Sequence, residues 1–344
     1  MRDMPNLDFV RSIAVISVVV EHTLLALGIQ QIGPFPIQYL GVLGVLVFFV
    51  LTSLVLMWSL ERKPHTLDFY IRRWFRIYPL ALVVIAVALL THAPTAGTPT
   101  DFFMWVHPNL KELVIQGSLL PLSARTSPDI LGVMWTLTYE VQMYILLPVV
   151  FFFVRRNFSL WPMFLIWWLT VLNARTYRTD GHNFAVALTY FLPGVMAYIA
   201  FGRWKPKLPA WTLPVFLLFM WLAFLPHFDF HHGWWFCLIL GLSLPLFHSF
   251  KAPVILACSR QIARYSYGIY LTHPFALIIG LYLLRSHSMA VRLFAELVPL
   301  IVLPIFAYHL IEHPMIRLGS RLAAKAERKY EQAEITRFRE LPVP

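Results

Sequence analysis

Charged residues are scarce in this chain of 344 residues. Asp, Glu, Lys and Arg make up 13% of the sequence, whereas a soluble domain carries about 25%. Hydrophobic residues reach 59%, and they fall into blocks of about 20 residues, the length of a helix that crosses a bilayer. The composition therefore excludes an ordinary soluble domain and indicates a polytopic membrane protein.

Cysteine and acidic residues are also few. The two cysteines, Cys237 and Cys258, have no metal-ligand spacing and suggest no disulfide framework, so we expect no metal site. The 17 acidic residues are outnumbered by 28 Lys and Arg, which gives a net charge of +11. In a membrane protein such an excess marks the cytoplasmic side, so membrane lipids and not nucleic acid are the expected surroundings.

The hydrophobic blocks predict an all-α membrane protein with ten transmembrane helices. The first block contains Glu21 and His22, which a cleavable signal peptide would avoid, so it is expected to be a permanent helix. The loops after the first and seventh blocks lack Lys and Arg, while those after the second, fourth, sixth and eighth are basic. This alternation places both termini in the cytoplasm. The predicted spans are 8–28, 37–58, 76–93, 133–154, 160–174, 184–202, 210–226, 234–248, 265–284 and 292–313.

The spans and their flanks define two regions. Residues 1–316 form the predicted membrane domain, and residues 317–344 form a charged cytoplasmic tail that is too short for a second catalytic domain. The long external segment 94–132 is amphipathic and is expected to lie along the membrane surface.

Ionisable side chains inside a bilayer cost about 2.5–3.5 kcal/mol each near its centre, and they usually mark function. Arg11 and His22 are eleven residues apart, so they share one helix face and lie roughly 16 Å apart along its axis. The structural alternative is an arginine that reaches toward the membrane surface and a histidine hydrogen-bonded in the core.

Three arginines cluster at the cytoplasmic start of the third span, Arg72, Arg73 and Arg76. Their spacing of three and four residues lets the side chains converge. Guanidinium groups bind phosphate through two parallel hydrogen bonds, so the cluster is a candidate phosphate site. The alternative is simple anchoring by positive charge at the inner membrane surface.

Two further polar stretches lie within predicted spans. Glu140, in "WTLTYEVQMY", is expected roughly 10 Å below the outer surface, at the depth of His22, where the carboxylate would orient the imidazole. Tyr270 and His273, in "YSYGIYLTH", are three residues apart near the middle of the ninth span. A purely structural Glu–His bond and simple helix-packing polarity are the alternatives for these stretches.

These stretches, taken in order, resemble the acyltransferase 3 family of integral membrane acyltransferases. The features that carry the resemblance are the Arg11–His22 spacing, "GVLGVLVFFVLTSLVL", the Arg73–Arg76 pair before a proline, "WTLTYEVQMY", "YSYGIYLTH" and "IEHP" near residue 312. Where the family often has two adjacent acids, this chain has Glu140 followed by Val141. The resemblance runs from about residue 7 to residue 314.

The resemblance implies an O-acyltransferase of the bacterial inner membrane. Its donor would be cytoplasmic acyl-CoA, with acetyl-CoA expected, and its acceptor a hydroxyl of a cell-surface polysaccharide, a lipid-linked sugar or a similar molecule. Arg11, Arg72, Arg73 and Arg76 would bind acyl-CoA, and no metal is expected.

In the same interpretation, His22 would take the proton of the acceptor hydroxyl, with Glu140 as its orienting partner. Tyr270 and His273 would line the acceptor or thioester pocket. A covalent acyl-histidine intermediate stays open as an alternative.

A different class of protein could use the same buried polar residues. A proton-coupled transporter or flippase for a polar solute would employ them as a proton relay, and it would be expected to contain inverted repeats. The sequence shows no internal symmetry, which favours the enzyme.

Overall fold

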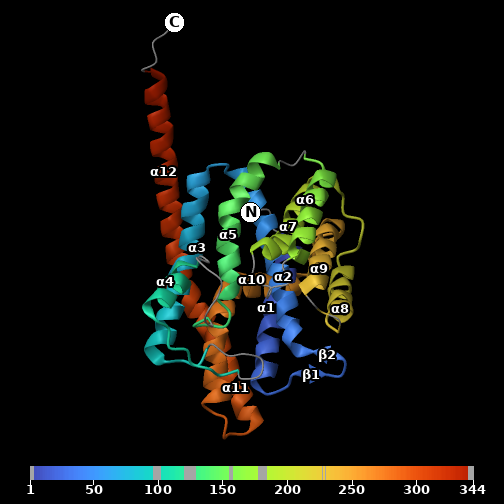
Figure 1. The fold of residues 1–344 in the computed structure, drawn as a ribbon, viewed down its shortest axis with the longest axis vertical. Helices are drawn as coiled ribbons and strands as arrows, with labels where there is room; N and C mark the ends of the chain where they lie inside the picture. Colours follow the sequence, from blue (N-terminus) through green and yellow to red (C-terminus); the bar gives the residue numbers. More distant parts are fainter. Residues whose placement is uncertain are drawn as a thin grey trace.

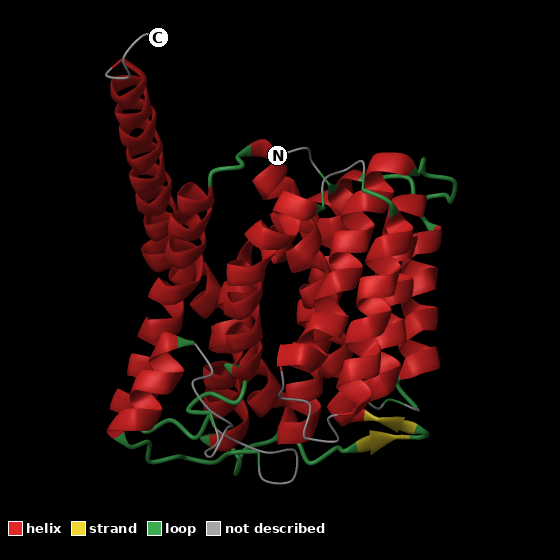
Figure 2. Cartoon of the chain, turned by 45° about the horizontal axis from the view of Figure 1, so that its top comes forward, coloured by secondary structure: helices red, strands yellow, loops and turns green. Residues whose placement is uncertain are grey.

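The computed structural model describes residues 4–95, 102–119, 129–154, 158–176, 184–226, 228 and 230–339. Helices dominate this part of the chain (Figure 1, Figure 2). The extended segments described are β1 (Gln31–Ile32), which pairs antiparallel with β2 (Phe35–Pro36), and an isolated bridge between Leu208 and Phe247. The expected all-α class is confirmed.

The α-helices follow the order of the hydrophobic blocks. They are α1 (Pro5–Ala26), α2 (Leu40–Arg62), α3 (Thr66–Thr91), α4 (Leu110–Ser118), α5 (Trp135–Phe153), α6 (Leu160–Thr176), α7 (Phe184–Arg203), α8 (Thr212–Phe224), α9 (Phe230–Ser243), α10 (Pro253–Leu277), α11 (Met289–Ala307) and α12 (His313–Arg339). Short 3₁₀ segments η1 (Ile37–Tyr39) and η2 (Leu244–Leu246) precede α2 and follow α9, and π-helical turns η3 (Ile278–Tyr282) and η4 (Tyr308–Glu312) follow α10 and α11.

Six helical segments among the described residues are long and apolar enough to cross a membrane, judged by length and composition. They are Pro5–Ala26, Ile37–Arg62, Thr66–Thr91, Trp135–Phe153, Val186–Arg203 and Met289–Arg328. Thr212–Phe224 and Gly233–Leu246 are shorter apolar helices. Every predicted span overlaps a helix, but six such segments do not establish the expected count of ten.

Large apolar side chains cover the outer surface of the bundle. On α11 the exposed ones include Phe294, Leu297, Val298 and Ile301. A soluble protein rarely exposes so continuous an apolar surface, whereas lipid chains would cover it. The fold is that of a multi-pass membrane protein.

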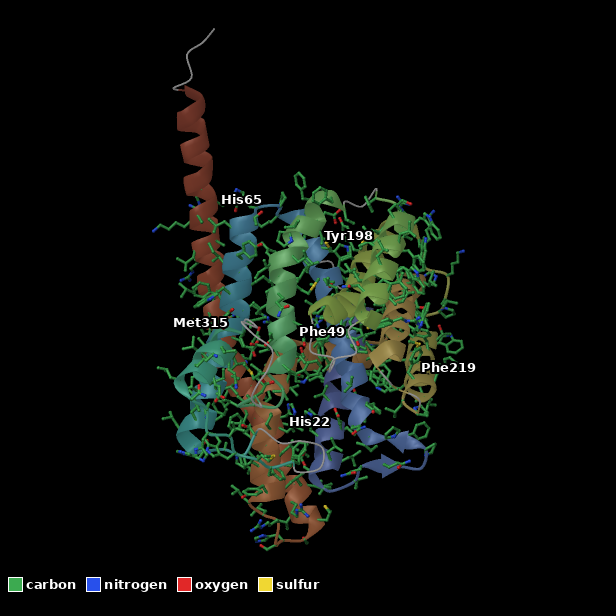
Figure 3. All side chains as sticks on the ribbon, in the orientation of Figure 1. His22, Phe49, His65, Tyr198, Phe219 and Met315 are labelled. Carbon is green, nitrogen blue, oxygen red and sulfur yellow. The ribbon has the colours of Figure 1, made fainter. Side chains whose placement is uncertain are left out.

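The bundle has two ends, which matter for the site. The terminal end holds the start of α1 and the loops next to α7 and α10: the Asn6 amide donates to the His248 carbonyl oxygen (3.1 Å), and Lys207 N–H donates to the Leu246 carbonyl oxygen (2.7 Å). The hairpin end holds β1, β2 and the turn before α11 (Figure 1). His22 lies toward the hairpin end, and His65 lies at the terminal end (Figure 3).

Three helical regions differ from the predicted spans, and one of them, α10, begins at Pro253 and not at residue 265. α3 begins at Thr66 and not at residue 76, so the arginine cluster lies inside the helix. α11, η4 and α12 form one continuous helical run from Met289 to Arg339, which passes through the expected domain boundary at residues 316 and 317. Beyond the bundle α12 continues past the end of α3, beside which it packs (Figure 1).

Candidate active site

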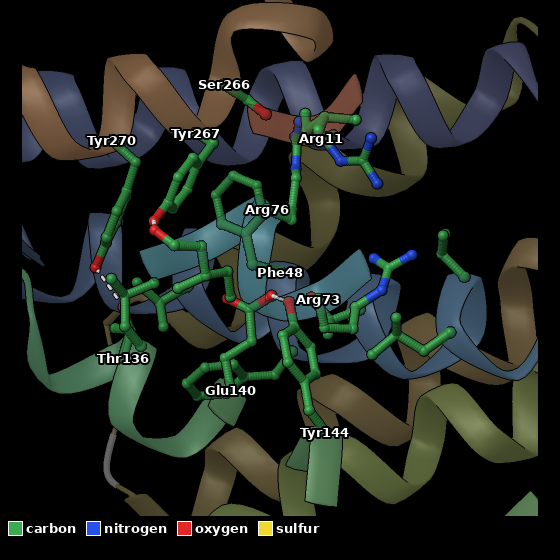
Figure 4. Close-up of a pocket in the computed structure, with 18 residues that line it drawn as sticks. Arg11, Phe48, Arg73, Arg76, Thr136, Glu140, Tyr144, Ser266, Tyr267 and Tyr270 are labelled. Carbon is green, nitrogen blue, oxygen red and sulfur yellow. Dashed lines mark hydrogen bonds between the residues drawn. The ribbon is translucent and has the colours of Figure 1, made fainter. Parts of the chain in front are cut away.

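A cavity of about 370 Å³ lies among α1, α2, α3, α5 and α10 (Figure 4). Phe48, Phe49 and Leu56 of α2 and Leu137 of α5 contribute apolar walls. The charged residues of the described lining are Arg11, Arg73, Arg76 and Glu140. The cavity is thus an apolar chamber in which three guanidinium groups and one carboxylate converge.

Two adjacent turns of α3 bring Arg73 and Arg76 into this cavity. The Arg76 Nη1 atom lies 3.5 Å from Glu312 Oε2, and its guanidinium carbon lies 5.8 Å from the centre of the Tyr267 ring. The Arg73 guanidinium carbon lies 5.7 Å from the Phe69 ring, and its buried Nε has no hydrogen-bond partner among the described residues. A desolvated guanidinium with a donor to spare can receive an anion.

Arg11 reaches the same cavity from α1, where its Nη1 lies 4.0 Å from Asp8. The structure therefore brings together three of the four arginines expected to bind acyl-CoA.

Arg72 is the exception. Its Nε and Nη2 donate to the two carboxylate oxygens of Asp68 at 2.8 and 2.9 Å, and its Nη1 donates to Ser320 Oγ at 3.0 Å. Asp68 is 2% exposed, so the carboxylate of this ion pair is buried. Arg72 lies outside the described lining of the cavity and ties α3 to α12.

Glu140 lies among the cavity arginines and not beside His22. The Tyr144 hydroxyl, one turn further along α5, donates to Glu140 Oε1 at 2.5 Å. The structure describes no hydrogen bond or ion pair between Glu140 and His22, so the expected pairing of these two residues is replaced by other partners. The reason is depth: Glu140 lines the cavity with Arg11, which precedes His22 by roughly 16 Å along α1.

The partner of His22 is His273. The His22 Nδ1 and His273 Nε2 atoms are 2.6 Å apart, and the two ring planes lie within 17° of each other with centroids 4.9 Å apart. His273 is fully buried. The histidine of α10 thus stands in the place that Glu140 was expected to occupy.

A hydrogen bond to the Ile269 carbonyl oxygen determines the tautomers of the two histidines. His273 Nδ1 lies 3.2 Å from the Ile269 carbonyl oxygen, which can only accept, so Nδ1 carries the proton. His273 Nε2 then bears a lone pair and accepts from His22 Nδ1–H. A neutral His22 with its proton on Nδ1 has an unprotonated Nε2, which is the atom available to take a proton.

Tyr270 connects the cavity with the histidine pair. Its hydroxyl lies 2.9 Å from Thr136 Oγ1 and 3.0 Å from the Val133 carbonyl oxygen, at the start of α5. Tyr270 lines the cavity (Figure 4). Its ring centroid lies 6.1 Å from that of His273, one turn along α10. The two parts of the site are therefore neighbours on a single helix.

Sequence reasoning missed three site residues, Thr136, Tyr144 and Glu312. Thr136 and Tyr144 each lie four residues from Glu140, so the helical repeat of "WTLTYEVQMY" contained the signal for both. Glu312 is 1% exposed and lies at the end of a π-helical turn, and no spacing rule would have paired it with Arg76. Among the described residues no group of three or more His, Cys, Asp or Glu side chains could hold a metal ion.

Comparison with known proteins identifies the family of the chain. The acyltransferase 3 family model, described as an acyltransferase domain, matches residues 4–310. The chain belongs to the acyltransferase 3 family. The match includes the cavity-lining residues and the histidine pair named above, whereas Glu312, the partner of Arg76, lies beyond its end.

A curated relative supports the same assignment over a shorter stretch. The acyltransferase MdmB of Streptomyces mycarofaciens is 30% identical over 146 residues, which are 40% of this chain and 35% of that protein. The match thus spans about a third of the relative's length. No solved structure matches the chain.

Proposed function

We propose that this acyltransferase 3 protein moves an acyl group, with acetyl as the expected one, from acyl-CoA to a hydroxyl group on a cell-surface polysaccharide, a lipid-linked sugar or a similar acceptor. One observation carries the proposal: an arginine-lined cavity ends one helical turn from a hydrogen-bonded histidine pair. The name of the relative MdmB, an acyltransferase, is consistent with it.

The donor would enter the cavity from the terminal end. Arg11, Arg73 and Arg76 would bind the coenzyme's phosphates through charge-assisted hydrogen bonds. The axial distance from Arg11 to His22, roughly 16 Å, suits the pantetheine arm, which would carry the thioester past Tyr270. Arg72 is assigned to the contact with α12 and not to the donor.

The reaction would begin when the acceptor hydroxyl reaches His22 Nε2. As His22 takes the proton, the hydroxyl oxygen bonds to the thioester carbon, and the carbon–sulfur bond breaks. The CoA thiolate leaves and receives the proton back from the imidazolium, so that ester, CoA thiol and neutral His22 result. His273 holds the imidazole in the required tautomer through its Nε2 lone pair.

Glu140 has a different role in this proposal from the one expected for it. Its carboxylate balances the charge of the cavity arginines while no donor is bound, and Tyr144 holds it in place. Tyr270 lines the route of the thioester, and its hydroxyl donates to the Val133 carbonyl oxygen at the start of α5.

The proposed setting is the bacterial inner membrane, with both termini in the cytoplasm. Acyl-CoA is made in the cytoplasm, so the terminal end with its arginines would face that side. The acceptor would then approach the histidine pair from the hairpin end.

The test uses the protein in lipid nanodiscs with [1-¹⁴C]acetyl-CoA. Release of CoA together with labelled acetate or a labelled acceptor supports the proposal, and mass spectrometry of surface glycans from deletion and wild-type strains identifies the acceptor. Solute movement across a proteoliposome without any consumption of acyl-CoA would instead establish the transporter.

A further inference from the structure

A second buried carboxylate lies on the acceptor side of the histidine pair. Thr23, the residue after His22, donates its hydroxyl to Glu296 Oε1 of α11 at 2.5 Å. Glu296 is 5% exposed. We propose that Glu296 and Thr23 form an acceptor-binding subsite that holds a hydroxyl of an uncharged sugar beside His22, an inference that rests on the acyltransferase function proposed above.

The position of Glu296 separates it from the donor cavity. It lies seven residues into α11, roughly 10 Å from the start of that helix at the hairpin end. The cavity arginines lie on the other side of His22, toward the terminal end, and Glu296 is not part of the described cavity lining. Donor and acceptor would therefore meet at His22 from opposite directions.

The charge of Glu296 argues for a ligand. A carboxylate inside a membrane-spanning helix costs several kcal/mol unless it is compensated, and such residues usually serve function. Glu296 makes no ion pair with any described residue. Thr23 supplies one hydrogen bond, while a carboxylate has room for about four. Hydroxyl groups of a sugar are donors of the kind that such a carboxylate accepts.

The fold holds Glu296 in place. A Cβ atom on Gly280, in the π-helical turn η3, would lie 2.5 Å from both the Cβ and the backbone nitrogen of Glu296. The backbones of η3 and α11 therefore touch here, which fixes the carboxylate relative to α10 and its His273. A site that positions a hydroxyl for attack requires such rigidity.

Aromatic rings complete the neighbourhood. The ring centroids of Phe102 and His22 are 5.6 Å apart in an edge-on arrangement, and those of Phe103 and Tyr282 of η3 are 5.1 Å apart. The apolar face of a sugar ring packs well on such rings, whereas an anionic acceptor would be repelled by Glu296. The arrangement fits a neutral, polyhydroxylated acceptor.

The experiment measures how the acyl group is divided between acceptor and water. Inside-out vesicles from cells that express each variant, in a strain without the native gene, receive [1-¹⁴C]acetyl-CoA. The ratio of label bound to vesicle material to label released as acetate is recorded after subtraction of a His22→Ala background. Because both products come from the same folded molecules, the ratio does not depend on how much protein folds.

Glu296→Gln and Thr23→Val should lower this ratio about 10-fold or more, the effect of losing one hydrogen bond to a charged group. Thr23→Ser keeps the hydroxyl and should retain the wild-type ratio. The matched control is Glu21→Gln, because Glu21 is an equally buried carboxylate on the other side of His22 but contacts Gly41 at the start of α2. Its ratio should not change.

An unchanged ratio in Glu296→Gln would overturn the subsite, and so would an equal fall in Glu21→Gln. Wild-type vesicles that consume no acetyl-CoA above the His22→Ala background would count against the proposed function itself, which keeps the two failures apart.

Discussion

The hydrogen bond between His22 and His273 determines what each imidazole can do. His273 Nδ1–H is held by the Ile269 carbonyl, so His273 can only accept from His22. The lone pair on His22 Nε2 is therefore the one that can take a proton from the acceptor. A pair of neutral rings avoids a buried charge until the proton is transferred, which suits a membrane interior.

The orienting role of His273 can be separated from its bulk. His273→Ala removes the acceptor for His22 Nδ1–H, so we expect turnover to fall by about 10²- to 10⁴-fold, the usual worth of general-base help. His273→Gln offers an amide oxygen in its place and should recover part of the loss. Steady-state kinetics with acetyl-CoA give both values. Equal turnover of the Ala variant and the wild type would remove His273 from the mechanism.

Two neighbouring arginines on α3 allow a matched test of the donor site, with Arg73 as the test position and Arg72 as its control. Arg73→Ala should raise the KM for acetyl-CoA about 10-fold or more, because a charge-assisted contact to phosphate is lost, and Arg73→Lys should recover it only in part. Arg72→Ala should leave KM unchanged and lower the thermal stability, because it breaks the bonds to Asp68 and Ser320. If the Arg72 variant alone loses donor affinity, the assignment of the cavity is wrong.

The sequence supplied many of the site residues but not their partners. Arg11, Arg73, Arg76 and Tyr270 were recognisable as polar groups in apolar helices, and all four line the cavity. The depth of Glu140 was not predictable in this way, because the expected depth assumed that its helix begins at the outer membrane surface. The residues before α5 are buried coil, with Ile130 and Leu131 at most 1% exposed, so α5 itself begins inside the protein.

At the scale of elements, glycines let the central helices approach closely. A Cβ on Gly194 of α7 would lie 2.1 Å from the Val50 carbonyl oxygen of α2, and one on Gly44 of α2 would lie 2.5 Å from the Ala14 carbonyl oxygen of α1. Small residues at helix crossings are the usual means of close packing in membranes. α2 therefore carries the cavity wall at a fixed distance from α1 and α7.

Gly194→Ala should thus destabilise the protein, by about 1–3 kcal/mol as for other overpacked sites. Gly117→Ala on α4 is the control, because the nearest atom to its new methyl group is 3.8 Å away and alanine favours the helix by up to about 1 kcal/mol. Thermal unfolding followed by tryptophan fluorescence compares the two. A midpoint for Gly194→Ala at or above the wild-type value would show that this helix crossing is not tightly packed.

The π-helical turns could not have been predicted from hydrophobicity. Each begins four residues after a proline, Pro274 or Pro304, which removes a backbone donor from the helix. The second turn ends at Glu312 and brings it to Arg76. Apolar patterning shows that a helix is present, but it does not show where the helical repeat changes, so the partner of Arg76 appears only in the structure.

At the scale of the whole molecule, the basic loop 203–207 lies at the terminal end, whereas the hairpin at residues 31–36, which contains no Lys or Arg, lies at the hairpin end. Single cysteines in a Cys258→Ser background test the proposed sidedness, with the buried Cys237 left in place. In intact cells an impermeant maleimide should label a cysteine in the hairpin, at residues 31–36, and should not label one at residues 203–207. External labelling of the second position would overturn the proposed topology.

The measurement that tests the account most directly is acetyl transfer by purified His22→Ala protein, with acetyl-CoA binding measured on the same sample. The account predicts that the variant binds the donor as the wild type does, because His22 lies outside the arginine-lined cavity. It also predicts that transfer falls by about 10²- to 10⁴-fold, because the base is missing. Wild-type transfer by His22→Ala would contradict the account at its centre.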